Sequence, residues 1–109
     1  MMSRADRSEK PDQAVQQVLE ALAPYEADHP AAQIEARRHN PVSIRLRIID
    51  PDFERVDKVS REETVWTFLD TLPDDVVSDI TMVILLTPDE AAQSVASFEF
   101  DNPVPSWLS

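Results

Sequence analysis

A strand, a loop and a helix follow one another between residues 42 and 72, and this succession constrains the fold more than any other part of the chain. Residues 42–48 alternate apolar and polar side chains, which is the period of a strand with one buried face. Beyond a loop, apolar residues recur at the spacing of one helix face until Pro73, which ends the helix. Ser60 and Glu63 have the spacing of a capping box, so we expect the helix to begin at Ser60.

Further elements are predicted on both sides of this stretch. Residues 11–23 carry a helical apolar stripe, and residues 32–37 alternate as a second strand. The two strands are expected to pair as an antiparallel hairpin through a turn at residues 38–41. Residues 80–87 indicate a third strand, and residues 88–96 a short helix. These patterns predict an α+β domain with a small three-stranded sheet, helices on one face and the order α-β-β-α-β-α.

The third strand is apolar on both of its faces. Its even-numbered side chains are expected to point toward the helices, and Val83 and Leu85 to point the other way. Helices on one face cover only the first set, so something else has to cover Val83 and Leu85. The tail of the chain, a second copy of the protein and a partner are the alternatives.

The chain divides into three predicted segments. Residues 1–10 are charged and almost without apolar side chains, which indicates disorder. Residues 11–97 form the α+β domain, and residues 98–109 form an acidic tail in which residues 98–101 are expected to be extended. The aromatic side chains of the tail either dock on the domain's own apolar face or serve as a linear motif for another protein. They are Phe98, Phe100 and Trp107.

Two absences exclude whole classes of site, because the 109 residues include no Gly and no Cys. Without Gly, a P-loop, a dinucleotide-binding fingerprint and a nucleophile elbow are excluded, since each needs a positive φ or a close backbone approach. Without Cys, the chain has no disulfide, thiolate metal site or Cys nucleophile. The chain also shows no secretory signal pattern and no apolar run that spans a membrane, so we expect a soluble cytoplasmic protein.

The net charge of −11 is distributed unevenly. All 10 Lys and Arg lie in residues 1–61, whereas residues 62–109 carry 10 of the 21 acidic residues and no base. An acidic half repels phosphate, so we do not expect bulk electrostatic binding to nucleic acid. This half either keeps the protein soluble or docks a basic partner.

Two local clusters of charge suggest alternative functions. The outer face of the hairpin carries Arg37, Arg45 and Arg47. These arginines either pair with acids such as Glu35 or form the nucleic-acid-binding patch of a transcriptional regulator. The loop over residues 50–57 has acids at alternate positions, which either cap the turn or make a divalent-cation-binding module. No catalytic triad or carboxylate pair in a pocket stands out, so we expect no enzymatic activity.

The loop and the central helix resemble those of the BolA family. Residues 53–69 lie on that family's motif without a gap, and the matching residues are Phe53, Glu54, Val59, Arg61, Val65, Trp66 and Leu69. Residues 87–90 resemble the threonine–proline–acid sequence that follows the family's last strand. The resemblance covers residues 12–92. It implies a BolA-like, class II KH-like fold and a non-enzymatic regulatory or adaptor role.

The chain departs from the family motif at two places. Arg55 stands where the family has Gly, and the sequence Arg61–Glu62–Glu63 stands where it has Arg–His–Arg. The resemblance implies that this His ligates an iron–sulfur cluster shared with a monothiol glutaredoxin, and His39 lies in the turn that often supplies a second ligand. Because the Glu62 carboxylate is a hard oxygen ligand, we expect no cofactor and no metal, with His39 as the one candidate ligand.

We therefore expect a non-enzymatic protein-interaction or adaptor protein. Its binding surface is predicted between the hairpin turn and the central helix, with His39, Arg61, Glu62 and Trp66 as candidate contacts. The partner is expected to be another protein, either a monothiol glutaredoxin or a basic protein, and neither nucleic acid nor a membrane. The protein itself is expected to be a monomer or a weak homodimer.

Overall fold

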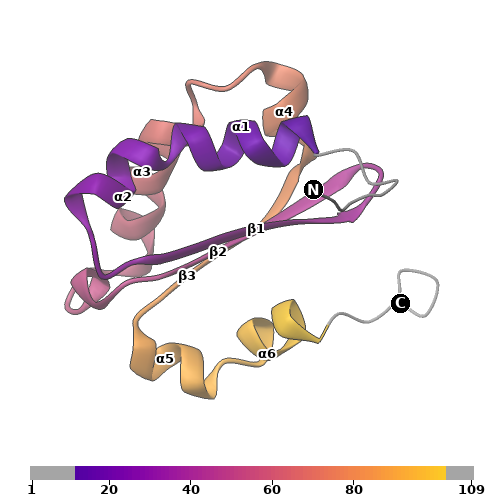
Figure 1. Ribbon diagram of the computed structural model, residues 1–109. Helices are drawn as coiled ribbons and strands as arrows, with labels where there is room; N and C mark the ends of the chain where they lie inside the picture. Colours follow the sequence, from indigo (N-terminus) through magenta and orange to yellow (C-terminus); the bar gives the residue numbers. More distant parts are fainter. Residues whose placement is uncertain (1–11, 103–109) are drawn as a thin grey trace, which may run out of the picture.

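A computed structural model describes residues 12–102 (Figure 1). In chain order the elements are α1 (Gln13–Ala21), α2 (Ala23–Asp28), β1 (Gln33–Asn40), β2 (Ser43–Ile49), the 3-10 helix η2 (Pro51–Phe53), α3 (Lys58–Leu69), α4 (Asp74–Asp79), β3 (Ile80–Leu86), α5 (Pro88–Gln93) and α6 (Val95–Asp101). The predictions for residues 1–10 and for Trp107 lie outside the described residues. Within residues 12–102, no helix combines the length and the apolarity needed to cross a membrane.

The sheet has the strand order β1-β2-β3, so β2 is the central strand. β1 and β2 pair antiparallel, with Gln33 opposite Ile49, and form the predicted hairpin. β2 and β3 run parallel, with Ile48 opposite Leu85. The helices α3 and α4 provide the crossover that a parallel pair requires. The three-stranded α+β fold predicted from the sequence is confirmed.

The main core lies between the sheet and the helices α1 to α4, which Figure 1 shows on one side of it. The central strand β2 turns Ile44, Leu46 and Ile48 toward these helices, and all three are fully buried. α3 contributes Val65 and Leu69, which are also fully buried. Burial of each such side chain stabilises the fold by about 2 kcal/mol. The alternation of β2 and the stripe of α3 therefore produce the core that the sequence predicts.

Two further helices, α5 and α6, cover the opposite face of the sheet (Figure 1). Phe100 of α6 packs with Ile84 and Leu86 in a second, smaller apolar cluster. The prediction of an extended segment over residues 98–101 is wrong, because these residues belong to α6. The Ser94 side chain caps the N-terminus of this helix. The sequence predicts a helical layer on one face of the sheet. The structure has that layer and a second one, formed by α5 and α6, on the opposite face.

The two faces of β3 are reversed relative to the prediction. Val83 and Leu85 face the main core, and the even-numbered side chains from Met82 onward face α6. The pairing register with β2 shifts at Thr81, which is left out between the pairs made by Ile80 and Met82. One extra residue reverses the alternation of every side chain that follows it. The expectation that Val83 and Leu85 need a separate cover is therefore wrong.

Helix ends differ from the prediction at two places. α3 begins before Ser60, because Asp57 is the N-cap and its carboxylate accepts a hydrogen bond from the Ser60 backbone N–H at 2.7 Å. The helix predicted over residues 11–23 is present as α1, and a second helix that was not predicted, α2, follows it, since Pro24 suits the first turn of a new helix. At the start of α5, Thr87 and Glu90 form a capping box.

Candidate functional site

The outward side of α3 borders a hollow of about 310 Å³. Two apolar side chains lie in it, Val59 and Trp66, between charged neighbours. Val59 is 68% exposed, and Trp66 is half-buried where it packs against the edge of the main core. The lining residues are Lys58, Val59, Glu62, Glu63 and Trp66. The helix thus turns one side to the core and presents apolar surface on the other.

A second hollow, of about 230 Å³, continues from the first along β3. It shares Lys58 and Glu62 with the first hollow, and it is bordered by residues 83–86 of β3 and by Ser94 and Ala96. Because β3 is an edge strand of the three-stranded sheet, one of its sides faces this hollow. We call the two hollows together the α3–β3 face.

Arg61 lies beneath the α3–β3 face and is only 4% exposed. Its guanidinium binds both carboxylate oxygens of Glu90, at 2.6 and 3.1 Å. It also donates to backbone carbonyls at distances of 2.8 to 3.1 Å, and these belong to Phe53, Val56 and Leu85. Arg61 therefore joins the loop after β2, the end of β3 and the start of α5, and its contacts are within the fold.

The ion pair with Arg61 changes the acidity of Glu90. The hydrogen bond from Arg61, and then that from the backbone N–H of Thr87, lower the pKa of Glu90 from 4.5 to about 2. The carboxylate is therefore charged at every pH at which the protein is expected to work. Glu90 is also part of the capping box of α5, and the contact with Arg61 adds a second role.

The structure separates His39 from the other predicted contact residues. His39 lies on β1, at the opposite edge of the sheet from β3, and lines a hollow of about 50 Å³ beside the hairpin. The hairpin end of β2 lies level with Ile80 at the start of β3, whereas Glu62 borders the later residues of that strand. Strand residues rise about 3.3 Å each, so these places are well apart. Glu62 and Trp66 share one hollow, and His39 lies in another.

The predicted basic patch is largely covered by α6. Arg47 is 5% exposed and forms ion pairs with Glu35 and, at 2.9 Å, with Asp101. The guanidinium groups of Arg37 and Arg47 lie 4.8 and 4.6 Å from the centre of the Phe100 ring, on which they stack. Burial alone would lower the pKa of Arg47, but its hydrogen bonds to Asp101 and Glu35 outweigh that effect and raise it. The expected pairing of Arg47 with Glu35 is confirmed.

The position of α6 also bears on the nucleic-acid alternative. Of the three hairpin arginines, Arg47 is used within the fold, and Arg37 donates to the backbone carbonyl of Phe100 at 3.0 Å. Arg45 remains half-buried beside the same aromatic ring. Phosphate binding by Arg47 would require displacement of α6, whereas the Arg37 side chain is 47% exposed.

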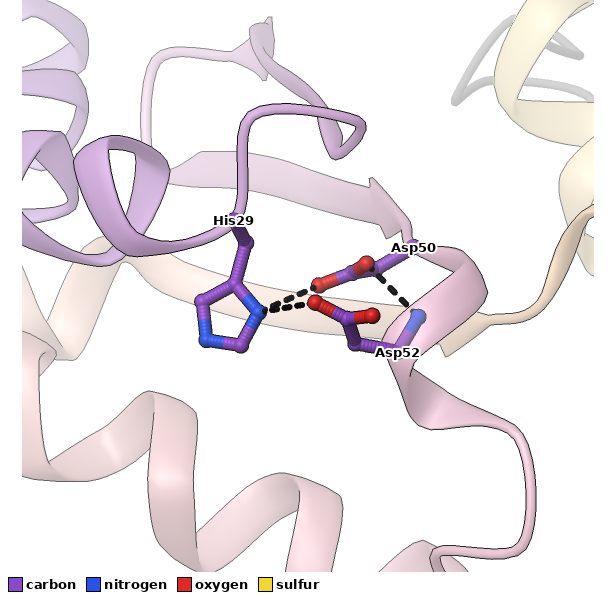
Figure 2. Close-up of side chains that lie close together, drawn as sticks. All are labelled: His29, Asp50 and Asp52. Carbon is purple, nitrogen blue, oxygen red and sulfur yellow. Dashed lines mark hydrogen bonds and ion pairs between the residues drawn. The ribbon is translucent and has the colours of Figure 1, made fainter.

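A further polar cluster joins α2 to the loop after β2 (Figure 2). His29 Nδ1 lies 2.7 Å from Asp52 Oδ2 and 3.4 Å from Asp50 Oδ2. The Tyr25 hydroxyl donates to Asp50 Oδ2 at 2.5 Å. Burial, and then the hydrogen bond to Asp50, raise the pKa of Tyr25. Two acids of the predicted cation loop are thus brought together, while Asp57 caps α3.

Sequence analysis did not single out His29 and missed this cluster. The available signal was the spacing of Tyr25 and His29, which are four residues apart and therefore share a face wherever the chain is helical. The helix predicted from the sequence ended at residue 23, so no helix was expected over Tyr25 and His29. The structure instead stacks the two rings, with centroids 4.1 Å apart and an angle of 16°.

Comparisons with known proteins bear on the fold. No model of a protein family matches the chain, and no curated protein matches it. Among solved structures, BolA1 from Arabidopsis thaliana is similar, with a TM-score of 0.51 and 14% sequence identity, over 72% of this chain and 96% of that chain. The fold is BolA-like. At this identity the similarity shows the fold alone.

The residues of the α3–β3 face do not fit the iron–sulfur cluster that the BolA resemblance implies. Such clusters are held by thiolates and in some cases by imidazoles. Neither hollow of this face has a Cys or a His among its lining residues, and Glu62 presents a hard carboxylate. The BolA-like fold of this chain therefore lacks the ligand at the position where the resemblance places it.

Proposed function

We propose that this BolA-like domain is a non-enzymatic cytoplasmic adaptor that docks a partner protein on the α3–β3 face. One observation carries the proposal: Val59 and Trp66 border a hollow that runs on along the edge strand β3. An apolar anchor site beside a strand edge suits a partner that adds an extended segment to the sheet. Pairing of main chains supplies affinity in this mode, and the anchor site supplies specificity.

The backbone of β3 supports this mode of binding. The carbonyl of Leu86 accepts a hydrogen bond from the Asp50 N–H on the side of β2, and the carbonyl of Leu85 accepts one from Arg61 on the other side. Because backbone groups of a strand alternate in direction, Val83 points its N–H and C=O to the same outer side as Leu85. An extended partner segment therefore has main-chain groups to pair with in the middle of β3.

Charge favours a partner with basic side chains next to its anchor residue. Glu62 and Glu63 are exposed beside Val59, and residues 62–109 carry acids without a single base. Complementary charge raises association rates, and this effect weakens as salt is added. We therefore expect the affinity for the partner to fall with ionic strength.

A monothiol glutaredoxin, the partner that the BolA resemblance implies, is the probe for the first test. We would titrate the 15N-labelled full chain with this glutaredoxin in its cluster-free and cluster-loaded forms. Amide shifts are expected to change at residues 58–66 and 83–86 with both forms. The visible circular dichroism of the cluster is expected to stay unchanged, because the α3–β3 face offers no soft ligand. No shift change with either form would overturn the proposal.

Two exposed valines provide a matched pair of variants for this titration. Val59 and Val42 are both 68% exposed, and Val42 lies at the hairpin, away from the α3–β3 face. Val59→Ala removes two methyl groups from the anchor site and is expected to weaken binding roughly fivefold, the equivalent of about 1 kcal/mol. Val42→Ala is expected to bind like the unaltered protein. Equal losses in both variants would contradict the proposed face.

A further inference from the structure

His29 lies against two carboxylates at the end of β2, in a cluster that shares no residue with the α3–β3 face (Figure 2). One imidazole nitrogen and two carboxylate oxygens in such proximity are a ligand set for a divalent transition metal. We propose that His29, Asp50 and Asp52 bind a divalent transition-metal ion and that Zn²⁺ suits them best. This site goes beyond the adaptor role and is independent of it.

The distances between the ligand atoms suit a tetrahedral ion with little movement. The three donor atoms all lie within 4.8 Å of one another. Ligands about 2.1 Å from Zn²⁺ stand about 3.4 Å apart in a tetrahedron. His29 Nδ1 and Asp50 Oδ2 are already 3.4 Å apart. Only the Asp52 carboxylate, 2.7 Å from His29 Nδ1, has to withdraw, and its side chain is 61% exposed.

Neighbouring groups hold two of the three ligands in place. The Tyr25 ring stacks on the His29 ring and fixes the direction of Nδ1 toward the acids. The Tyr25 hydroxyl donates to Asp50 Oδ2, and the backbone N–H of Asp52 donates to Asp50 Oδ1 at 2.9 Å. Hydrogen bonds from outer-shell groups of this kind hold metal ligands in a fixed orientation. The site is therefore largely formed before an ion enters.

The local charge also calls for a cation. Asp50 is fully buried, and Asp52 lies directly beside it. Within residues 12–102, their ion-pair partner is His29, and neither acid pairs with a Lys or an Arg. Arg61 borders the adjoining hollow of about 100 Å³, but its guanidinium is bound to Glu90. A divalent ion would neutralise these two carboxylates, which one imidazole cannot do.

The donor atoms select the class of metal. Ca²⁺ and Mg²⁺ prefer oxygen ligands throughout, whereas an imidazole nitrogen suits Zn²⁺ and its transition-metal neighbours. Binding at Nδ1 requires the neutral imidazole with its proton on Nε2, so that Nδ1 presents a lone pair to the ion. His29 is 28% exposed and Asp52 more so, which leaves a side open for water as a further ligand.

The test uses the full chain freed of metal and then titrated with ZnCl₂. Side-chain 1H–15N spectra follow both histidines of the sequence, and calorimetry gives stoichiometry and affinity. We expect one ion per chain and a shift of the His29 Nδ1 resonance, with His39 unmoved. CaCl₂ and MgCl₂ at the same concentration are expected to leave His29 unchanged. A zinc response centred on His39, or an equal response to calcium, would overturn the proposal.

Three variants separate a designed ligand set from adventitious binding to a surface histidine. His29→Gln and Asp52→Asn each remove one ligand and are expected to weaken zinc binding by more than about tenfold. His39→Gln is the matched control and is expected to keep the parent affinity. Retained affinity in His29→Gln would refute the site. The spectra of the unaltered protein decide the matter even if a variant folds poorly.

Discussion

Arg55 adopts a backbone conformation that an ordinary residue resists. Its φ of 67° lies in the left-handed region, and it is the one non-glycine residue in the described range with a positive φ. That region costs about 1–2 kcal/mol for a residue with a Cβ atom. The BolA resemblance places Gly at this position. The loop between β2 and α3 therefore keeps its turn although the chain has no glycine to make it.

We predict that Arg55→Gly stabilises the protein. Relief of the left-handed strain is offset in part by the greater backbone freedom of Gly when unfolded, so a net gain of about 0.5–1 kcal/mol is expected. Urea unfolding of the two proteins measures the difference. Glu54→Gly is the control, because its φ is −54° and Gly brings no relief there. An unfolding midpoint for Arg55→Gly at or below that of the parent would contradict this explanation.

The depressed pKa of Glu90 links one residue to the acid stability of the whole protein. Because the folded pKa is about 2 and the ordinary value is 4.5, the pairing with Arg61 stabilises the fold fully above pH 4.5. The contribution is lost as the pH falls toward 2. Glu90→Gln, which can still cap α5, is expected to be less stable at pH 7 and to lose less stability between pH 5 and 2. Unfolding free energies with parallel slopes over that range would argue against the link.

The helix α6 is the element that changes what the sheet exposes. Two aromatic residues on it face opposite ways. Phe100 lies against the hairpin arginines and is 2% exposed, whereas Phe98 is 66% exposed. Phe100 also lies under Arg37 and Arg47. Phe100 is therefore the apolar contact of this helix with the sheet, beside the polar contacts of Arg47 with Ser97 and Asp101.

We predict that Phe100→Ala destabilises the protein by about 3 kcal/mol, through lost burial and the cavity left behind. Phe98→Ala, two residues away in the same helix, is expected to change stability by less than about 0.5 kcal/mol. Urea denaturation followed by far-UV circular dichroism gives both values. Similar values for the two variants would show that α6 does not dock through Phe100.

Local pattern predicted the elements well and their ends less well. Alternation in residues 42–48 and the stripe before Pro73 involve neighbours in the chain, so the sequence carries them directly. Ser60 was the predicted N-cap of α3, and Asp57 is the observed one. Both side chains can accept a hydrogen bond from a backbone N–H, and only packing selects between them. The shift at Thr81 depends on pairing with β2, which no local pattern encodes.

The polar sites were harder to predict for the same reason. Arg61 reaches Glu90 across 29 positions, and His29 reaches Asp52 across 23. The sequence indicates that such residues are chemically capable, but the fold alone decides which of them meet. Glu62 and Trp66 do line one hollow, because they lie four residues apart on one helix.

At the scale of the molecule, a single thin sheet carries two cores of unequal size. The cluster beneath α1 to α4 contains 11 buried side chains, and the cluster beneath α6 contains three. Elements with few buried apolar contacts open at lower free energy than the rest of a fold. The two layers are therefore not expected to open together.

We predict that hydrogen exchange separates the two layers. Amides of α6 are expected to exchange at least about tenfold faster than those of β2 at Leu46 and Ile48, under conditions where the protein stays folded. Native-state exchange followed by NMR in low urea provides the comparison. Exchange of all amides through one common opening event would mean that α6 is an integral part of the main core.

The contacts of Arg61 bear on how much the amino-acid sequence can change while the fold is kept. Its acceptors on the loop and on β3 are main-chain carbonyls, and every amino acid carries one. Residues 53, 56 and 85 can therefore be exchanged, as far as this interaction is concerned, while the path of the chain is held. A fold that is held by main-chain contacts can be kept while many of its side chains change. A chain held in this way can have a BolA-like fold while sharing 14% of its residues with BolA1 from Arabidopsis thaliana.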